Sequence, residues 1–246
     1  MVQFASPMHA TGSRPHLANR AILVAALLLP SAITWIYFIA LAHAPAAAQQ
    51  IAYAALKAIQ FALPLAWVWI VHRERPRWPP LNSRGLLLGA AFGLAVALAM
   101  AALYRILLEP RGLFALPAQQ VQTKITAFGL DSPAKFILFA LFCSAMHSLL
   151  EEYYWRWFVF RQLSRWTSLP VAIAISSLGF AAHHVLVLQL YFGCNSPLTW
   201  LFSAGVAVGG AAWAWLYHRC GSLYAPWLSH ALVDAAIFAI GYDLIA

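Results

Sequence analysis

Three short runs place ionisable residues inside long apolar stretches of the chain. They are EEYYWR (151–156), FAAHH (180–184) and HALVD (230–234). Ionisable side chains inside a membrane are costly and usually mark a functional site. A buried carboxylate beside an imidazole can act as a general base that activates water. The three runs therefore indicate hydrolytic chemistry, if the fold brings them together.

The first run contains two adjacent carboxylates that cannot easily share one role. Glu151 and Glu152 point about 100° apart on a helix. Glu152 precedes Arg156 by four residues, which is the favourable order for an ion pair on one helical face. We therefore expect Glu152 and Arg156 to form a supporting pair, leaving Glu151 on a neighbouring face with His147 one turn before it. The alternative is that the cluster only marks the cytoplasmic end of a helix.

The other two runs supply imidazoles and a third carboxylate. His183 and His184 are adjacent in the sequence, so at most one of them is expected to point at a given site. Taken alone, both could be core histidines bonded to backbone carbonyls. His230 and Asp234 are four residues apart and lie on one face of a helix. Asp234 could take part in chemistry or simply orient the His230 ring.

The composition requires these runs to lie in membrane helices. Of 246 residues, 63% are hydrophobic and 9% are charged, whereas a soluble domain averages about 45–50% apolar and about 25% charged residues. The mean hydropathy is +0.74. The apolar runs are continuous, which excludes the alternating pattern of a transmembrane β-barrel. We predict an all-α polytopic membrane bundle of about seven helices.

Seven apolar runs are long enough to cross a hydrocarbon core of about 30 Å. They are Ala21–His43, Ile51–His72, Gly85–Leu108, Phe136–Phe160, Leu169–Leu190, Leu198–Tyr217 and Leu223–Ala246. We expect a cytoplasmic tail over residues 1–20, N-terminal transmembrane helices and connecting loops over 21–134, and a catalytic helical core over 135–246. The three cysteines form no CxxC pair, so no disulfide and no cysteine-based metal site is expected.

The basic residues predict the orientation of the chain. The net charge is +8, with 15 Lys and Arg against 7 Asp and Glu. With the N-terminus inside, ten basic residues fall in inner segments and four in outer ones, as expected for a cytoplasmic N-terminus. The remaining one, Lys57, is expected near the outer end of the second span, where its side chain would snorkel. We expect a multi-pass protein of a bacterial inner (plasma) membrane, in contact with the lipid bilayer. The sequence has no stripe of basic residues that would indicate nucleic-acid binding.

Three features outside these runs predict local structure. Gly85, Gly89 and Gly93 repeat every four residues, as do Gly205 and Gly209, a spacing that lets membrane helices approach closely. Residues 118–128 could form an interfacial helix or a plain loop. Residues 73–84, rich in arginine and proline, are expected to be a cytoplasmic connector.

The helical rise places the three runs at similar depths. At 1.5 Å per residue from the cytoplasmic ends, Glu151 lies at roughly 18 Å, His184 at roughly 22 Å and His230 at roughly 12 Å. These depths fall in one layer near the middle of the membrane. The side chains could therefore converge from three separate helices.

The three runs also resemble the motifs of a known family. EEYYWR is similar to the EExxxR motif of the CPBP intramembrane proteases, which include CAAX prenyl endopeptidases and bacteriocin-processing enzymes. FAAHH is similar to their FxxxH motif, and HALVD to their third motif, His-x-x-x-Asn or Asp. The motifs occur in the family's order, and the resemblance covers roughly residues 135–246.

The resemblance implies roles for individual residues. Glu151 would be the base that activates water, assisted by His184. His230 and Asp234 would stabilise the oxyanion or orient the site. An Asn at position 234 would donate a hydrogen bond directly, whereas an Asp must be protonated or act through the histidine.

The remaining motif positions are structural or unassigned under the resemblance. Glu152 and Arg156 would support the architecture through their ion pair. His183 falls on an unspecified position of the second motif and receives no role.

The dependence on metal is the open chemical question at this point. We favour a metal-free glutamate mechanism without a cofactor. The alternative is zinc bound by Glu151, His184 and His230, since two histidines and a carboxylate leave one position for water. The HExxH pattern of the zincins is absent.

The resemblance implies an intramembrane endopeptidase that hydrolyses a peptide bond of a membrane-associated protein or peptide substrate. A prenylated CAAX tail, a processed peptide and a sorting tail are all compatible substrates. A non-catalytic scaffold or bacteriocin-immunity-type relative of the same fold is the main alternative. A transporter is disfavoured, because neither inverted repeats nor interrupted helices are found.

Overall fold

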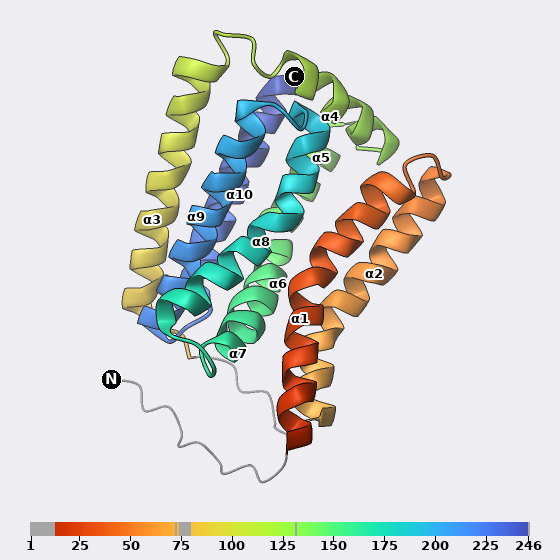
Figure 1. Ribbon diagram of the computed structural model, residues 1–246. Helices are drawn as coiled ribbons and strands as arrows, with labels where there is room; N and C mark the ends of the chain where they lie inside the picture. The colour runs from red at the N-terminus through yellow and green to blue at the C-terminus, as the bar shows by residue number, and fades with distance from the viewer. Residues whose placement is uncertain (1–12, 72, 74–79, 131, 246) are drawn as a thin grey trace.

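The computed structural model describes residues 13–71, 73, 80–130 and 132–245, and over these residues every regular element is helical (Figure 1). Several helices continue into wider π-helical segments, labelled η. The elements in chain order are α1 (Ser13–Trp35), η1 (Ile36–Ala40), α2 (Ala46–Ala66), η2 (Trp67–Val71), α3 (Ser83–Leu103), η3 (Tyr104–Leu108), α4 (Ala115–Ala127), α5 (Pro133–Phe142), η4 (Cys143–His147), α6 (Ser148–Glu152), η5 (Tyr153–Phe160), α7 (Arg161–Leu163), α8 (Leu169–Phe192), α9 (Pro197–Cys220) and α10 (Tyr224–Ile245). The predicted all-α fold is confirmed.

Six of these helical stretches are long and apolar enough to cross a membrane, so the protein is a multi-pass integral membrane protein. They are Ala18–Ala40, Ala46–Val71, Ser83–Leu108, Pro133–Leu163, Leu169–Phe192 and Pro197–Cys220. The seventh predicted span forms α10, which is 22 residues long but is not among the six. It bears His230, Asp234 and Asp243, and it packs along α3 and α9 inside the same bundle.

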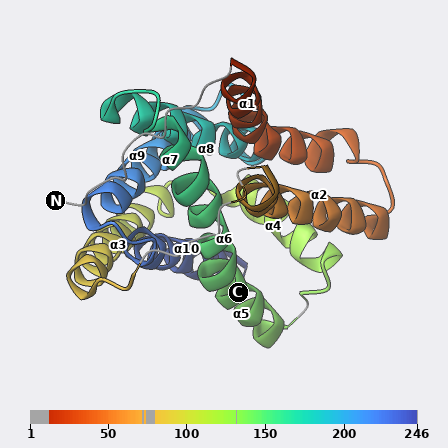
Figure 2. The ribbon, with the colours of Figure 1, turned by 90° about the horizontal axis from the view of Figure 1, so that it is seen from below.

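The bundle has two parts, which Figures 1 and 2 show from two directions. Helices α3, α8, α9 and α10 pack side by side with the long stretch from α5 to α7. The antiparallel pair α1 and α2 stands at one side, where α1 packs against α8. Helix α4 crosses the end of the bundle near the C-terminal end of α10, and of the two alternatives left open for residues 118–128, a helix or a plain loop, the helix is the one found.

Close packing of α3 on α10 explains the first glycine repeat. A Cβ atom on Gly89 would lie 2.2 Å from the carbonyl oxygen of Ala225, and one on Gly93 would lie 2.9 Å from that of Ser229. Both distances are impossible for a side chain, so these glycines let the two backbones touch. The expectation for the second repeat was wrong, because nothing lies within 4 Å of a Cβ on Gly205.

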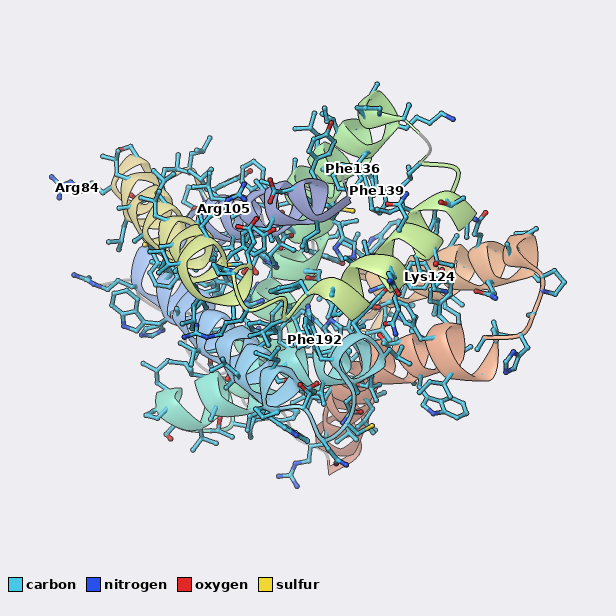
Figure 3. The ribbon with its side chains drawn as sticks, turned by 90° about the horizontal axis from the view of Figure 1, so that it is seen from above. Arg84, Arg105, Lys124, Phe136, Phe139 and Phe192 are labelled. Carbon is cyan, nitrogen blue, oxygen red and sulfur yellow. The ribbon has the colours of Figure 1, made fainter. Side chains whose placement is uncertain are left out.

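Polar caps and aromatic contacts fix the ends of α3, α5 and α10. Asn82 accepts from the backbone N–H of Gly85 at 3.1 Å, which caps the first turn of α3. At the other end, Arg105 pairs with Asp243 of α10 at 2.7 Å. Phe136 of α5 lies against Phe238 of α10, with ring centroids 6.2 Å apart (Figure 3). Most of the expected 73–84 connector lies outside the described residues.

The segment η5 forms the centre of the fold. All eight of its residues, Tyr153–Phe160, are buried. It contacts α1, α2, α8 and α9, and the aromatic rings of the segment fill the space between these helices. Because α6 precedes η5 directly, this packing holds Glu151 and Glu152 at the middle of the bundle.

Candidate active site

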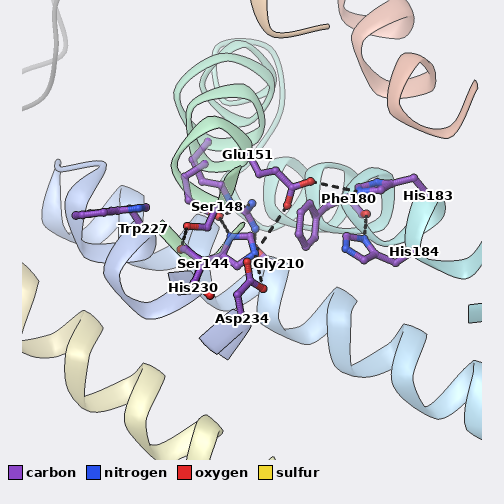
Figure 4. A network of polar contacts seen from close by, with 12 residues as sticks. Ser144, Ser148, Glu151, Phe180, His183, His184, Gly210, Trp227, His230 and Asp234 are labelled. Carbon is purple, nitrogen blue, oxygen red and sulfur yellow. Dashed lines mark hydrogen bonds and ion pairs between the residues drawn. The ribbon is translucent and has the colours of Figure 1, made fainter. Parts of the chain in front are cut away.

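The Glu151 carboxylate faces two imidazoles that come from different helices (Figure 4). Glu151 of α6 is only 4% exposed. Its Oε1 atom lies 3.7 Å from Nε2 of His183 on α8, and its Oε2 atom lies 3.8 Å from Nε2 of His230 on α10. The three motifs therefore meet around one carboxylate, as their common depth predicted.

The histidine opposite Glu151 is His183, not His184 as the resemblance implied. Among the described residues no ion pair within 4 Å joins His184 to Glu151, and the Nδ1 atom of His184 donates to the carbonyl oxygen of Phe180, one turn earlier, at 3.0 Å. The two imidazoles remain in contact, with ring centroids 4.1 Å apart. Because neighbouring residues on a helix are rotated by about 100°, the two histidines present different faces, and His183 is the one that lies within 4 Å of Glu151.

Glu152 connects the first motif to the third. One of its oxygens, Oε1, lies 2.9 Å from the Arg156 guanidinium and 2.8 Å from Nδ1 of His230. The expected pair between Glu152 and Arg156 is therefore present, but the same carboxylate also binds the histidine. Because a carboxylate only accepts hydrogen bonds, this contact places a proton on Nδ1 of His230 and directs Nε2 toward Glu151.

The Arg156 guanidinium is compensated in the centre of the protein from several sides. Its side chain is 2% exposed. Besides Glu152, it donates to the carbonyl oxygen of Gly210 at 3.0 Å and lies over the rings of Phe180 at 4.8 Å and Trp213 at 5.3 Å. A buried charge requires such a set of partners.

Two further residues orient the His230 ring. Trp213 of α9 stacks on it, with centroids 4.0 Å apart and planes 17° apart, and the Trp213 indole donates to Ser229 at 2.9 Å. Asp234 lies 3.6 Å from the Nε2 atom and is 19% exposed. No sequence pattern pointed to Trp213, because a tryptophan in an apolar helix is an ordinary membrane residue.

A family model matches the part of the chain that contains the three motifs. Residues 133–236 match the family model described as Type II CAAX prenyl endopeptidase Rce1-like. This segment belongs to the CPBP family. The CPBP segment (residues 133–236) contains all three motifs and every side chain described here around Glu151. The family is one of CAAX-type proteases. No curated protein and no solved structure matches the chain significantly.

An apolar cavity lies beside the first motif of the CPBP segment. Its volume is about 400 Å³. Its lining comes from α2, α6 and η5, from the first residue of α10 and from the residue directly before that helix. The lining residues are Phe61, Leu65, Leu149, Leu150, Tyr153, Leu223 and Tyr224. Because Leu149 and Leu150 directly precede Glu151, the cavity is next to the helix that positions the candidate base. An apolar cavity close to a few polar groups is typical of a ligand site.

The residues of the CPBP motifs do not form an obvious metal centre. Within the described part of the chain, no three His, Cys, Asp or Glu side chains are grouped closely enough to hold a metal ion. In the zinc set considered above, His184 has turned toward Phe180. Nδ1 of His230 is bound to Glu152, which leaves Nε2 as its free nitrogen. The metal-free mechanism remains a prediction for experiment.

Proposed function

We propose that this protein is an intramembrane endopeptidase in which Glu151 activates the water that cleaves a peptide bond of a membrane-associated substrate. The observation behind this proposal is the buried Glu151 carboxylate with one imidazole opposite each of its oxygens, at 3.7 and 3.8 Å. The description of the family model points to a C-terminal CAAX sequence as the first substrate class to test.

The spacing around Glu151 suits a bound water. The two nitrogen–oxygen separations exceed the usual hydrogen-bond range of about 2.7–3.2 Å. Since neither imidazole forms a close hydrogen bond to Glu151, the carboxylate and the imidazoles are free to bind a water that lies beside them. Glu151 would take a proton from this water as its oxygen attacks the substrate carbonyl, and would then give the proton to the leaving amine. His183 would hold the water in line with Glu151.

His230 is proposed to stabilise the oxyanion that forms on the substrate. Its Nδ1–H is fixed by Glu152, and Arg156 balances the charge of that glutamate. Asp234, 3.6 Å from Nε2, would favour a second proton on the ring. A ring protonated at Nε2 can donate a hydrogen bond to developing negative charge, and such preorganised donors contribute strongly to catalysis.

The proposed assignment gives the remaining motif residues positioning roles. Glu152 and Arg156 act through His230, as partners of catalytic groups commonly do. Asp234, 3.6 Å from Nε2 of His230, also acts through that histidine. The N-terminus is proposed to lie in the cytoplasm of a bacterial cell, which the excess of basic residues in the inner segments supports.

The experiment is hydrolysis of a defined peptide by the full-length protein, purified and placed in lipid vesicles. A farnesylated peptide with a C-terminal CAAX sequence is incubated with the wild type, and the products are identified by mass spectrometry. We expect one cleavage in the wild type, none above background in Glu151→Gln, and normal cleavage in the control Glu109→Gln. Equal products from the wild type and Glu151→Gln would contradict the proposal, and a wild type without any proteolysis would favour the non-catalytic scaffold.

A further inference from the structure

A single lysine lies deep in the second membrane span. Lys57 is eleven residues after the start and fourteen before the end of the span Ala46–Val71. This places it near the middle of the span, not near the outer end where the sequence analysis expected it. A lysine at the centre of a membrane helix is costly and usually functional, so its position asks for a reason.

Two aromatic rings lie close to the Lys57 ammonium, and no carboxylate of the described residues forms an ion pair with it. The Nζ atom lies 5.7 Å from the ring centroid of Tyr53 and 5.5 Å from that of Phe61, each one turn away on α2. Two rings at these distances stabilise a cation and hold it on one face of the helix. Within the described residues no acidic group forms an ion pair with Lys57, although the Glu151 carboxylate acts on it electrostatically. The ammonium is therefore able to accept an anionic ligand.

Phe61 connects this lysine to the candidate active site. Its ring lies over the Lys57 ammonium and contacts the ring of His147, with centroids 6.1 Å apart. His147 is one turn before Glu151 on the same span. Phe61 also lines the apolar cavity beside the first motif. Phe61 therefore touches the lysine, the helix of the candidate base and the apolar cavity at one interface between α2 and the CPBP segment.

We propose that Lys57 binds the free C-terminal carboxylate of the substrate, on the leaving-group side of the peptide bond that is cleaved. This inference rests on the proposed function, because a CAAX sequence ends in a carboxylate a few residues beyond its cysteine. A carboxylate that approaches Glu151 without a counter-charge would be repelled by it, and that repulsion is strong at low dielectric. Lys57 offsets the repulsion and fixes the end of the chain.

The depth of Lys57 favours a peptide carboxylate over a lipid headgroup. Headgroup phosphates lie at the two surfaces of a hydrocarbon core about 30 Å thick. A lysine in the middle of its span is far from both surfaces. An extended peptide that lies across the cavity can bring its end to this depth, since each residue adds about 3.3–3.6 Å.

The test compares one farnesylated CAAX peptide with a free carboxylate and the same peptide with a C-terminal carboxamide. We measure kcat/KM for both with the full-length protein in phosphatidylcholine vesicles. The wild type should prefer the free acid by about 10- to 100-fold, as expected for a charge-assisted contact. The preference should fall to less than about twofold in Lys57→Met and in Lys57→Gln, and it should persist in Lys57→Arg.

Lys124→Met is the matched control. Lys124 also lies between two aromatic rings, 5.6 Å from the centroid of Tyr37 and 5.7 Å from that of Phe38. It lies on α4 at the end of the bundle (Figure 3). This variant should keep the acid-to-amide ratio of the wild type.

Three results would overturn the proposal. The first is equal cleavage of acid and amide by the wild type, and the second is an unchanged preference in both neutral variants of Lys57. The third is a lipid site: activity that depends on added phosphatidylglycerol through Lys57, with no difference between acid and amide.

Failure of the proposed function would be visible separately, as no cleavage of either peptide. Binding of the two fluorescently labelled peptides to the wild type and Lys57→Met then decides the question. Tighter binding of the acid that Lys57→Met abolishes supports the carboxylate site, and equal binding of acid and amide refutes it.

Discussion

The substitution Arg156→Met tests whether the three motifs are held together by a buried charge network. The Arg156 side chain is 2% exposed and the Glu152 side chain 0%, and one guanidinium nitrogen lies 2.9 Å from Oε1 of the glutamate. Removal of one partner of such a pair leaves the other charge buried without full compensation, at a cost of about 3–5 kcal/mol. In Arg156→Met, only His230 would remain as a partner of Glu152. We therefore expect the free energy of unfolding to fall by roughly that amount.

An exposed arginine provides the matched control. Arg105 pairs with Glu109 at 3.0 Å and with Asp243 at 2.7 Å, but its side chain is 55% exposed. Exposed ion pairs contribute about 0–1 kcal/mol, so Arg105→Met should cost at most that amount. The double variant Glu152→Gln, Arg156→Met removes both buried charges and should recover at least about half of the loss seen in Arg156→Met.

The assay is equilibrium unfolding in mixed micelles by titration with sodium dodecyl sulfate, followed by tryptophan fluorescence. The chain contains 11 tryptophans, and several of them lie in the core around η5. If Arg156→Met and Arg105→Met cost the same small amount, the buried network does not hold the motifs together. The same conclusion would follow if the double variant were less stable than Arg156→Met.

Three further predictions concern the site and the helix packing. His183→Gln should lower kcat by about 10²-fold or more, and His184→Gln by a smaller factor, because His183 is the one of the two that lies within 4 Å of Glu151. The opposite order in peptide hydrolysis would return the role to His184. Incubation with 1,10-phenanthroline and EDTA should leave kcat/KM within about twofold, as a base that needs no metal predicts, whereas a loss that added zinc restores would support the metal alternative. Gly89→Ala should lower the free energy of unfolding by about 1–3 kcal/mol, because the new Cβ would meet the Ala225 carbonyl; Gly205→Ala, which meets nothing, should not destabilise, and equal losses would refute the close contact of α3 and α10.

The sequence was sufficient to predict the fold class and most of the convergence. Composition and the length of the apolar runs require membrane helices, and the four-residue spacing of Glu152 and Arg156 predicts their pair. The spacing of Gly85, Gly89 and Gly93 correctly indicates a close helix contact. These properties depend on local periodicity, which the sequence contains directly.

What the sequence could not predict depends on helix rotation and on distant neighbours. Both His183 and His184 are compatible with the pattern, and only the packing of α8 against η5, which follows α6, decides which one lies within 4 Å of Glu151. The contact of Glu152 with His230 joins residues 78 positions apart. The position of Trp213 on His230 depends on how α9 packs against α10. The sequence analysis placed Lys57 too near the outer end of its span, because α2 begins at Ala46, five residues before the apolar run that hydropathy indicated.

The most direct test of the central claim is the turnover number of Glu151→Gln, which keeps the shape of the side chain and removes the base. The measurement is kcat on the farnesylated CAAX peptide, together with the dissociation constant of that peptide. We predict a loss of about 10²–10⁴-fold in kcat, with peptide binding and the free energy of unfolding close to those of the wild type. A kcat within tenfold of the wild type in a correctly folded Glu151→Gln protein would contradict the role of Glu151 as the base.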